Sequence, residues 1–262
     1  MKQFSFQHNV ALAVLVVGIV ASVWAARRHP GRWMKPFSIA LAALIFAAWA
    51  GEYVADVIVG TWSVQYTLPL QLTDAVSIAA IVALLTRRQL FVEMAYFWTF
   101  TATLQAVITP DLGQGFPSVF YFTYFIYHIG AIVAAAYLVV GCRLYPRRGA
   151  AWWMFGLTLV WAAIAGAGDV ITGGNYMYLR AKPVHASLLS VMSPWPWYIP
   201  EAALVGLAML LLVAAITRAL GGVPGSPTIP PATPNGYGRH DPATDPAGRG
   251  FPGPTDAAVG GP

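Results

Sequence analysis

The sequence predicts an all-α membrane protein, a polytopic bundle of seven transmembrane helices with its N-terminus outside and its C-terminus in the cytoplasm. Three observations support this prediction: the composition, the spacing of the apolar runs and the placement of Lys and Arg. Of the 262 residues, 58% are hydrophobic and only 10% are charged. Because soluble domains carry about 25% charged residues, the composition excludes an ordinary soluble protein.

Seven apolar runs approach the length of roughly 20 residues that a helix needs to cross a bilayer. They are residues 10–26, 37–59, 68–85, 90–108, 119–141, 151–172 and 197–220. The third and fourth runs are short and are joined only by residues 86–89, which predicts a tight helical hairpin. None of the runs shows strand alternation, so we expect each to satisfy its backbone hydrogen bonds as a helix.

Lys and Arg gather in every second connection between the runs, although the sixth connection also holds Arg180 and Lys182. The first connection holds Arg27, Arg28, Arg32 and Lys35, the third Arg87 and Arg88, the fifth Arg143, Arg147 and Arg148, and Arg218 begins the C-terminal side. Since cytoplasmic loops carry the excess of basic residues, these connections are predicted to lie in the cytoplasm of a multi-pass plasma-membrane protein. The first run precedes its basic cluster, so we interpret it as a retained anchor and not as a cleaved signal peptide.

The composition changes sharply after the seventh run. Residues 1–220 form the predicted transmembrane domain, whereas the 42 residues from 221 to 262 contain ten glycines and ten prolines. Such a segment buries too little apolar surface to offset the entropy of ordering the chain. We therefore expect residues 221–262 to form a disordered cytoplasmic tail.

Several classes of site are disfavoured by what the sequence lacks. The single cysteine, Cys142, excludes an internal disulfide and a multi-cysteine site. No two histidines are four residues apart, so no helical metal motif is predicted, and a site from His128, Asp74 and Asp169 is the less favoured alternative. We find no phosphate-binding loop and no basic patch with interleaved aromatics, so we expect neither a cofactor nor nucleic acid as a partner.

The polar residues within the runs lie mostly in the half that faces outside. Ionisable groups in a membrane are costly and often functional. Two interpretations compete for them. In one, they pair within the bundle and specify its packing, for example Asp74 or Asp169 with His128, and Arg180 with Asp111. In the other, they line a cavity below the outer surface, covered by the long loop before the seventh run. Their common depth favours the cavity.

Thr73 and His128 are the best candidates for chemistry in such a cavity. Thr73 would be the nucleophile, His128 the general base, and Asp74 or Asp169 would orient the imidazole. Thr73 lies about 8 Å and His128 about 14 Å below its helix start at 1.5 Å per residue, so helix tilt must close the gap. The alternative for Thr73 is a bond to a carbonyl one turn earlier.

Other polar residues of the outer half are predicted to bind the substrate. They are Gln71, Gln105, Asp111, Asn175, Tyr178, Arg180 and Lys182. Among them, Gln71 and Asn175 would donate hydrogen bonds to an oxyanion. Arg180 and Lys182 would hold the phosphate of a lipid headgroup, which makes a membrane lipid the expected partner. The sequence predicts no particular protein partner.

Several motifs of this chain resemble a known family. They are Leu68-Pro69-Leu70-Gln71-Leu72-Thr73-Asp74, Tyr96-Phe97-Trp98, Leu104-Gln105-Ala106, Thr109-Pro110-Asp111-Leu112, Tyr127-His128, the segment 173–183 and Pro194-Trp195-Pro196-Trp197-Tyr198. Over most of residues 40–215 the chain resembles the YwaF-like family of bacterial integral membrane proteins, in an actinobacterial form.

That family is similar to a eukaryotic transmembrane ether-phospholipid acyltransferase family, in which a cysteine works with a histidine on a later span. The corresponding motif reads Leu-His-Leu-Cys or Leu-His-Leu-Ser. This chain has Gln71 at the histidine position and Thr73 at the cysteine position, and His128 falls where the later histidine is expected. A similar fold in androgen-induced proteins that hydrolyse fatty-acid esters uses a threonine with a histidine.

The resemblance therefore implies hydrolysis or transfer of an acyl ester of a lipid. Two alternatives remain: a non-catalytic binding or transport protein for a small polar solute, and a structural membrane scaffold whose polar groups only pair with one another.

Overall fold

The computed structural model describes residues 3–184, 187–219 and 221, and this part of the chain is helical without any strand. The predicted tail, residues 221–262, lies outside the described residues except for Gly221. The helices are α1 (Phe6–Arg28), α2 (Met34–Val59), α3 (Leu72–Thr86), α4 (Gln89–Trp98), α5 (Leu104–Ile108), α6 (Val119–Ala136), α7 (Ala150–Thr172) and α8 (Tyr198–Ala219). Two π-helical segments, η1 (Thr99–Thr103) and η2 (Tyr137–Gly141), continue α4 and α6, and two 3-10 turns, η3 (Tyr176–Tyr178) and η4 (Leu188–Val191), lie between α7 and α8.

Within the described residues, five helices are long and apolar enough to cross a membrane. They are α1, α2, α6 together with η2, α7 and α8, which match the first, second, fifth, sixth and seventh predicted runs. The third run gives the shorter helix α3, and the fourth is divided into α4, η1 and α5. The hairpin predicted between these two runs is present, because Arg87 adopts a left-handed conformation that ends α3 directly before α4.

Helix α3 begins later than the apolar run that predicts it. Pro69 disfavours a helical conformation at Leu68, and Gln71 is extended, with φ −68° and ψ 150°. The backbone N–H of Gln71 donates to the Asp74 carboxylate, 2.9 Å away, which caps the first turn. The residues before Leu72 therefore form a connecting segment, and Thr73 is the second residue of its helix.

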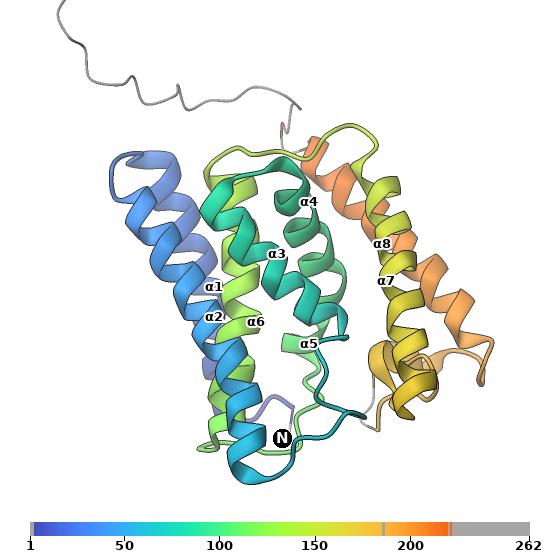
Figure 1. The fold of residues 1–262 in the computed structure, drawn as a ribbon. Helices are drawn as coiled ribbons and strands as arrows, with labels where there is room; N and C mark the ends of the chain where they lie inside the picture. Colours follow the sequence, from blue (N-terminus) through green and yellow to red (C-terminus); the bar gives the residue numbers. More distant parts are fainter. Residues whose placement is uncertain (1–2, 185–186, 220, 222–262) are drawn as a thin grey trace, which may run out of the picture. The chain divides into compact units, whose positions relative to one another are not determined.

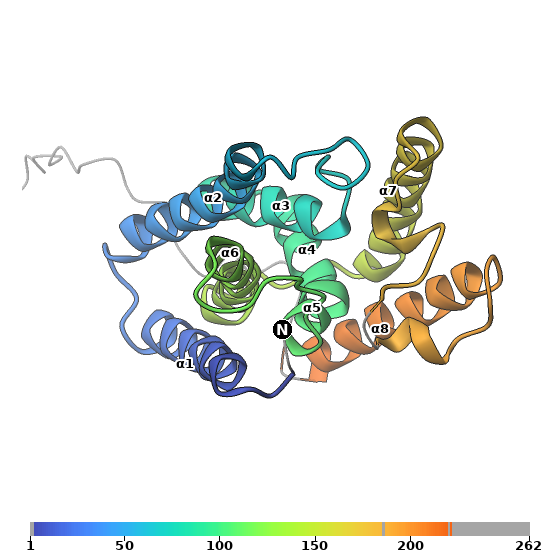
Figure 2. The same cartoon turned by 90° about the horizontal axis from the view of Figure 1, so that it is seen from below.

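Helix α6 is the centre of the fold. In the view of Figure 2, α6 is surrounded by α1, α2, α3, α4 and α5, whereas α7 and α8 lie on the other side of α4 and α5. Most of the α6–η2 span is buried, while α1, α7 and α8 are mostly exposed and apolar. Helices that are apolar around most of their circumference are typical of lipid-exposed spans. Lipid is thus the expected surrounding of these outer helices.

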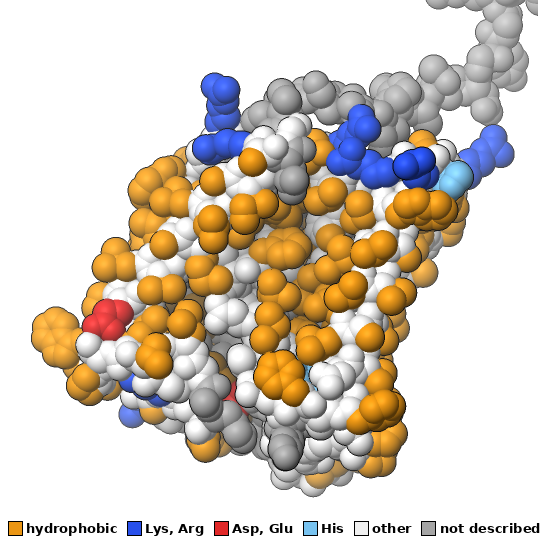
Figure 3. Space-filling model, turned by 180° about the vertical axis from the view of Figure 1, so that it is seen from behind, with side chains coloured by type: hydrophobic (Ala, Val, Ile, Leu, Met, Phe, Trp, Pro, Cys, Tyr) orange, Lys and Arg blue, Asp and Glu red, His pale blue; other side chains and the backbone are white. Residues whose placement is uncertain are grey.

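The two ends of the bundle differ in charge. Figure 1 shows the α1–α2 and α3–α4 connections at the same end, and most Lys and Arg side chains visible in Figure 3 lie along that end. There the buried Glu93 of α4 forms an ion pair with Arg147, with 2.7 Å between Oε2 and Nη2. Glu93 also accepts from the Arg147 backbone N–H and from Gln89. This pair fastens the α6–α7 connection to α4.

The loops at the opposite end are tied together by one tyrosine. Helices α2 and α7 end there at glycines with left-handed φ, Gly60 and Gly173, a conformation that glycine adopts without steric cost. The fully buried Tyr176 donates from its hydroxyl to the Val64 carbonyl at 2.7 Å. The same hydroxyl accepts the Leu68 N–H at 2.9 Å. The loop after α7 is therefore held to the segment that leads into α3.

Candidate functional site

A cavity of about 580 Å³ lies at the end of the bundle opposite the basic side chains. Its walls come from α2, α3, η1, α5, α6 and α8, and from the loop between α7 and α8. Six of the residues singled out from the sequence line it. They are Gln71, Thr73, Gln105, Asp111, His128 and Tyr178. The cavity thus brings together residues from four separate parts of the chain.

Thr73 enters the cavity from the first turn of α3. Its hydroxyl makes no hydrogen bond to any described residue, whereas its carbonyl accepts the Ser77 hydroxyl at 2.9 Å. The bond back to an earlier helical carbonyl, considered above, is not formed, because Thr73 is only the second residue of α3. The N-terminal end of a helix carries a partial positive charge. Any negative charge that develops on the Thr73 oxygen is therefore favoured by its position.

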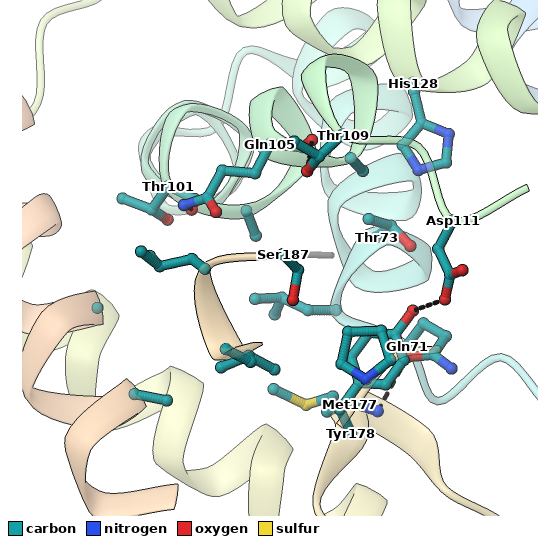
Figure 4. Close-up of a pocket in the computed structure, with 18 of the residues that line it drawn as sticks. Gln71, Thr73, Thr101, Gln105, Thr109, Asp111, His128, Met177, Tyr178 and Ser187 are labelled. Atoms are coloured by element: carbon teal, nitrogen blue, oxygen red, sulfur yellow. Dashed lines mark hydrogen bonds between the residues drawn. The ribbon is translucent and has the colours of Figure 1, made fainter. Parts of the chain in front are cut away.

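His128 is held by its own helix. Its ring is almost completely buried, and Nδ1 lies 2.7 Å from the carbonyl oxygen of Tyr124, four residues earlier in α6. A carbonyl oxygen can only accept, so Nδ1 carries the proton and Nε2 has a free lone pair. Nε2 makes no hydrogen bond within the described residues. Figure 4 shows the ring directed toward the part of the cavity that Thr73 and Asp111 line.

This arrangement corrects one expectation. Neither Asp74 nor Asp169 orients the imidazole, because the Tyr124 carbonyl occupies the nitrogen that such a carboxylate would need. The pairing of either aspartate with His128, expected in the packing interpretation, is also absent from the described residues. Both carboxylates are nearly fully buried and take other donors.

Asp74 joins α3 to α2. Its Oδ1 accepts the indole N–H of Trp49 at 2.9 Å and the hydroxyl of Tyr53 at 2.7 Å, and its Oδ2 accepts the Gln71 N–H. Asp74 is not among the described residues that line the cavity. Because Thr73 is its neighbour, Asp74 determines where the first turn of α3, and hence the Thr73 hydroxyl, lies.

Asp169 has a similar structural position at the end of α7. Its Oδ1 accepts the Tyr176 N–H at 2.6 Å, which fixes the start of η3, while its buried Oδ2 has no hydrogen-bond partner within the described residues. Asp169 does not belong to the described lining of the cavity. Its effect on the site passes through Tyr176 and the loop that follows.

Three predicted substrate-binding residues also build this loop instead of lining the cavity. Asn175 accepts the backbone N–H groups of Arg180 and Ala181 at 2.9 and 3.0 Å. Arg180 donates from Nη1 to the carbonyls of Asp169 and Gly174. Lys182 donates to the Met192 carbonyl at 2.7 Å. These hydrogen bonds hold the loop in place.

The remaining predicted residues have defined positions in the cavity wall. Gln71 accepts the Met177 N–H at 2.9 Å through its side-chain oxygen, which leaves its NH₂ group as the donor. Gln105 donates to the Thr101 carbonyl at 3.1 Å. Tyr178 donates to Asp111 at 3.0 Å. Burial, followed by the charge of Asp111, raises the pKa of Tyr178, so its phenol keeps its proton and remains a donor.

Glu52, Tyr124 and Tyr127 are among the wall residues that have no role assigned from the sequence. The Oε2 atom of Glu52 is buried and has no hydrogen-bond partner within the described residues. A carboxyl group inside an apolar run was the available signal for it. Tyr124 and Tyr127 precede His128 by four residues and by one, so Tyr124 lies on the same face of α6 as His128. An aromatic side chain in an apolar run does not by itself predict a position in a cavity wall.

The described residues contain no group of three or more His, Cys, Asp or Glu side chains that could hold a metal ion. The less favoured alternative, a metal site from His128, Asp74 and Asp169, is therefore not assembled. Among the described residues, the cavity instead presents the Thr73 hydroxyl, Nε2 of His128, the Gln71 NH₂ group and Oε2 of Glu52 without hydrogen-bond partners.

Comparisons with known proteins identify a family for the chain. No curated protein and no solved structure matches it. A family model described as the TMEM164 family matches residues 3–214, which include α1 to α7 and most of α8. The match spans both Thr73 and His128 and all the cavity walls. The chain therefore belongs to the TMEM164 family, a family of membrane proteins.

Proposed function

We propose that this membrane protein hydrolyses or transfers an acyl ester of a membrane lipid, with Thr73 as the nucleophile and His128 as the general base. The observation that carries the proposal is that the Thr73 hydroxyl and the free nitrogen of His128 belong to the same cavity wall, and no described residue occupies either of them. The resemblance to YwaF-like and acyltransferase-like proteins points to the same chemistry.

The reaction follows from these groups. His128 Nε2 removes the Thr73 proton as the hydroxyl oxygen attacks the ester carbonyl, and the imidazolium then protonates the leaving alcohol. The acyl group, now on Thr73, passes to water in hydrolysis or to a second alcohol in transfer, with His128 again removing the proton of the attacking hydroxyl. The Gln71 amide and the N-terminus of α3 would stabilise the oxyanion.

The proposal places the cavity below the outer leaflet of the plasma membrane, in a bundle of seven spans with an extracellular N-terminus and a cytoplasmic C-terminus. Five long apolar helices support it, and α3 with α4–η1–α5 would supply the other two crossings. The gathering of basic side chains at the end opposite the cavity supports this orientation. Membrane lipid would then reach the cavity from the bilayer.

A fluorophosphonate probe that reacts with activated hydroxyl nucleophiles tests the chemistry. We expect it to label the wild-type protein and Thr73→Ser, and to lose the label in Thr73→Ala and His128→Gln. Thr86→Ala is the matched control, because Thr86 bonds only locally at the far end of α3. Equal labelling of wild type and folded Thr73→Ala would remove Thr73 from the mechanism.

A second function, the binding or transport of a small polar solute, is favoured by Glu52. A buried carboxyl oxygen without a partner is costly, and a ligand that donates a hydrogen bond to it would remove that cost. This function predicts saturable binding that survives Thr73→Ala and is weakened by Glu52→Gln. In a purely structural scaffold, neither substitution would change more than stability.

A further inference from the structure

A second cavity adjoins the first on the side of α7 and α8. It has a volume of about 230 Å³ and lies between α4, η1, α7 and α8, with Trp98, Phe155, Leu159, Ala162, Ala203 and Leu210 in its walls. We call it the side chamber. Several residues line both cavities: Leu72, Thr101, Ala102, Met177, Tyr178, Leu189, Ala202 and Gly206. The side chamber therefore branches from the main cavity next to Leu72, the residue that precedes Thr73.

Within the described residues, every side-chain hydrogen-bond donor in the walls of the side chamber has a protein partner. The Trp98 indole donates to the Thr158 hydroxyl at 2.7 Å, and Thr158 donates in turn to the Met154 carbonyl. The Thr101 hydroxyl donates to the Phe97 carbonyl at 2.8 Å. Tyr178 donates to Asp111, and Tyr198 donates to the Tyr178 carbonyl.

Every polar side chain of this lining is thus satisfied within the protein, and the remaining lining side chains are aliphatic, aromatic or thioether groups. Apolar cavities of this kind exclude water and take up hydrocarbon. The main cavity is different, because the hydroxyl of Thr73, Nε2 of His128 and the carboxyl of Glu52 all retain free positions there. A polar cavity with an apolar branch fits an amphiphile.

Where the side chamber meets the main cavity, the walls contain a π-helical segment and several small residues. Thr101 and Ala102, which line both cavities, belong to the π-helical segment η1. Segments of π-helix are frequent at functional sites. On the facing helix, Gly206 also lines both cavities, and a Cβ built there would meet no atom within 4 Å. Small residues on α7 and α8, above all Ala162, Ala203 and Gly206, therefore leave the volume open.

We propose that the side chamber binds the alkyl chain of an acyl lipid whose ester lies beside Thr73, and that Ala162 and Ala203 set the length of chain that it accepts. This assignment rests on the proposed function only for the position of the ester. The occupancy of the chamber by an alkyl chain is a separate claim, and it is tested without any reaction.

The first experiment measures binding in Thr73→Ala protein, with alkyl glycerol ethers that contain no ester. Their dissociation constants are measured for chains from octyl to hexadecyl. Burying one methylene contributes about 0.8 kcal/mol, so we expect affinity to rise about fourfold per methylene until the chamber is full. Ala162→Phe and Ala203→Phe should end this rise at a shorter chain, and Phe155→Ala should extend it.

The matched control is Ala163→Phe, the same substitution at the next residue of α7, which is exposed and is not part of the described lining. It should bind like the Thr73→Ala parent. Equal chain-length profiles for all these variants would overturn the proposal. Because Ala162→Phe and Ala203→Phe fill the chamber whereas Phe155→Ala empties it, misfolding cannot produce opposite shifts in preferred length.

The second experiment measures ester hydrolysis in the same substitutions with Thr73 restored. If the side chamber holds the acyl chain, Ala162→Phe should lower kcat/KM for long acyl esters and leave acetyl esters unchanged. Length-dependent ether binding without hydrolysis would retain the side chamber and refute the proposed enzyme. Hydrolysis with an unchanged chain preference in Ala162→Phe and Ala203→Phe would refute the side chamber and retain the enzyme.

Discussion

Nδ1 of His128 donates a hydrogen bond to the Tyr124 carbonyl oxygen, 2.7 Å away, so the backbone of α6 fixes the tautomer and orientation of the imidazole, a task that a carboxylate performs in a serine-protease triad. A backbone acceptor cannot be removed by a side-chain substitution, and it holds the ring at a fixed rotation relative to α6. The tautomer is therefore a property of the helix itself, and it leaves Nε2 as the only basic position of the ring.

His128→Gln tests the role of this nitrogen. General-base catalysis contributes about 10²–10⁴-fold to rate, so we expect ester hydrolysis to fall by a factor in that range while binding of an ether analogue is retained. The comparison of kcat with ether affinity separates chemistry from packing. A variant that folds and hydrolyses at the wild-type rate would contradict the assignment of His128 as base.

Asp74→Asn tests a positioning role. The amide can still accept from Trp49 and Tyr53, but its NH₂ group must then face the Gln71 N–H that the carboxylate now binds. Leaving a buried donor unsatisfied costs about 1–3 kcal/mol, so thermal unfolding should show a loss of this size. Hydrolysis should fall through kcat, because Thr73 shifts with the first turn of α3.

The control for Asp74→Asn is Asp56→Asn at the exposed end of α2, where the carboxylate bonds to Thr61. It should leave both stability and kcat close to wild type. An Asp74→Asn protein with unchanged kcat would show that the capped turn does not position Thr73.

Arg147→Ala should destabilise the protein without altering the site. Glu93 is fully buried and takes hydrogen bonds from both the side chain and the backbone of Arg147. Hydrogen bonds to charged groups contribute about 1.5–3 kcal/mol, and this loss should appear in thermal unfolding. Arg148→Ala, the neighbouring substitution, should unfold like wild type, and unaltered unfolding of Arg147→Ala would mean that the pair does not stabilise the α6–α7 connection.

Cysteine labelling in intact cells tests the proposed orientation. In a Cys142→Ser background, Gly113→Cys lies in the loop near the cavity and Gly31→Cys in the basic α1–α2 connection; a Cβ at either position fits without a clash. A membrane-impermeant maleimide should label Gly113→Cys alone, and Gly31→Cys should react only after permeabilisation. The reverse pattern would invert the bundle and place the cavity on the cytoplasmic side.

Much of the fold follows from hydrophobic length alone. Five of the predicted runs return as long apolar helices, and the residues 86–89 form the expected hairpin. The late start of α3 depends on Pro69 and on the cap that Asp74 makes, and neither effect can be predicted from the length of the apolar run. The division of the fourth run by η1 is also invisible in hydropathy, because a π-helical turn changes the backbone and not the composition.

Some properties of the site can be predicted from the sequence, and others depend on contacts between distant residues. Position within an apolar run predicts approximate depth, and Thr73 and His128, both predicted to lie in the outer half, line the same cavity. Hydrogen-bond partners are not readable, because they come from distant residues: Asp74 takes its donors from Trp49 and Tyr53. The Lys182 ammonium group likewise donates a hydrogen bond to the Met192 carbonyl, and Lys182 is not among the described residues that line the cavity. Asp74, Asp169, Arg180 and Lys182 therefore serve the packing of the loops and helices, and their predicted roles in the cavity do not follow from the structure.

Tyr176 has one more consequence. Its hydroxyl bridges Val64 and Leu68, and Met177 beside it binds the Gln71 side chain. Three hydrogen bonds of 2.7–2.9 Å therefore connect this turn to the non-helical segment before Thr73, so a lipid that displaced the turn would also displace that segment. Under the proposed function, entry of the lipid and alignment of the attacking Thr73 oxygen are coupled through this turn, and Tyr176→Phe should lower kcat for the ester while leaving the affinity for an ether analogue unchanged.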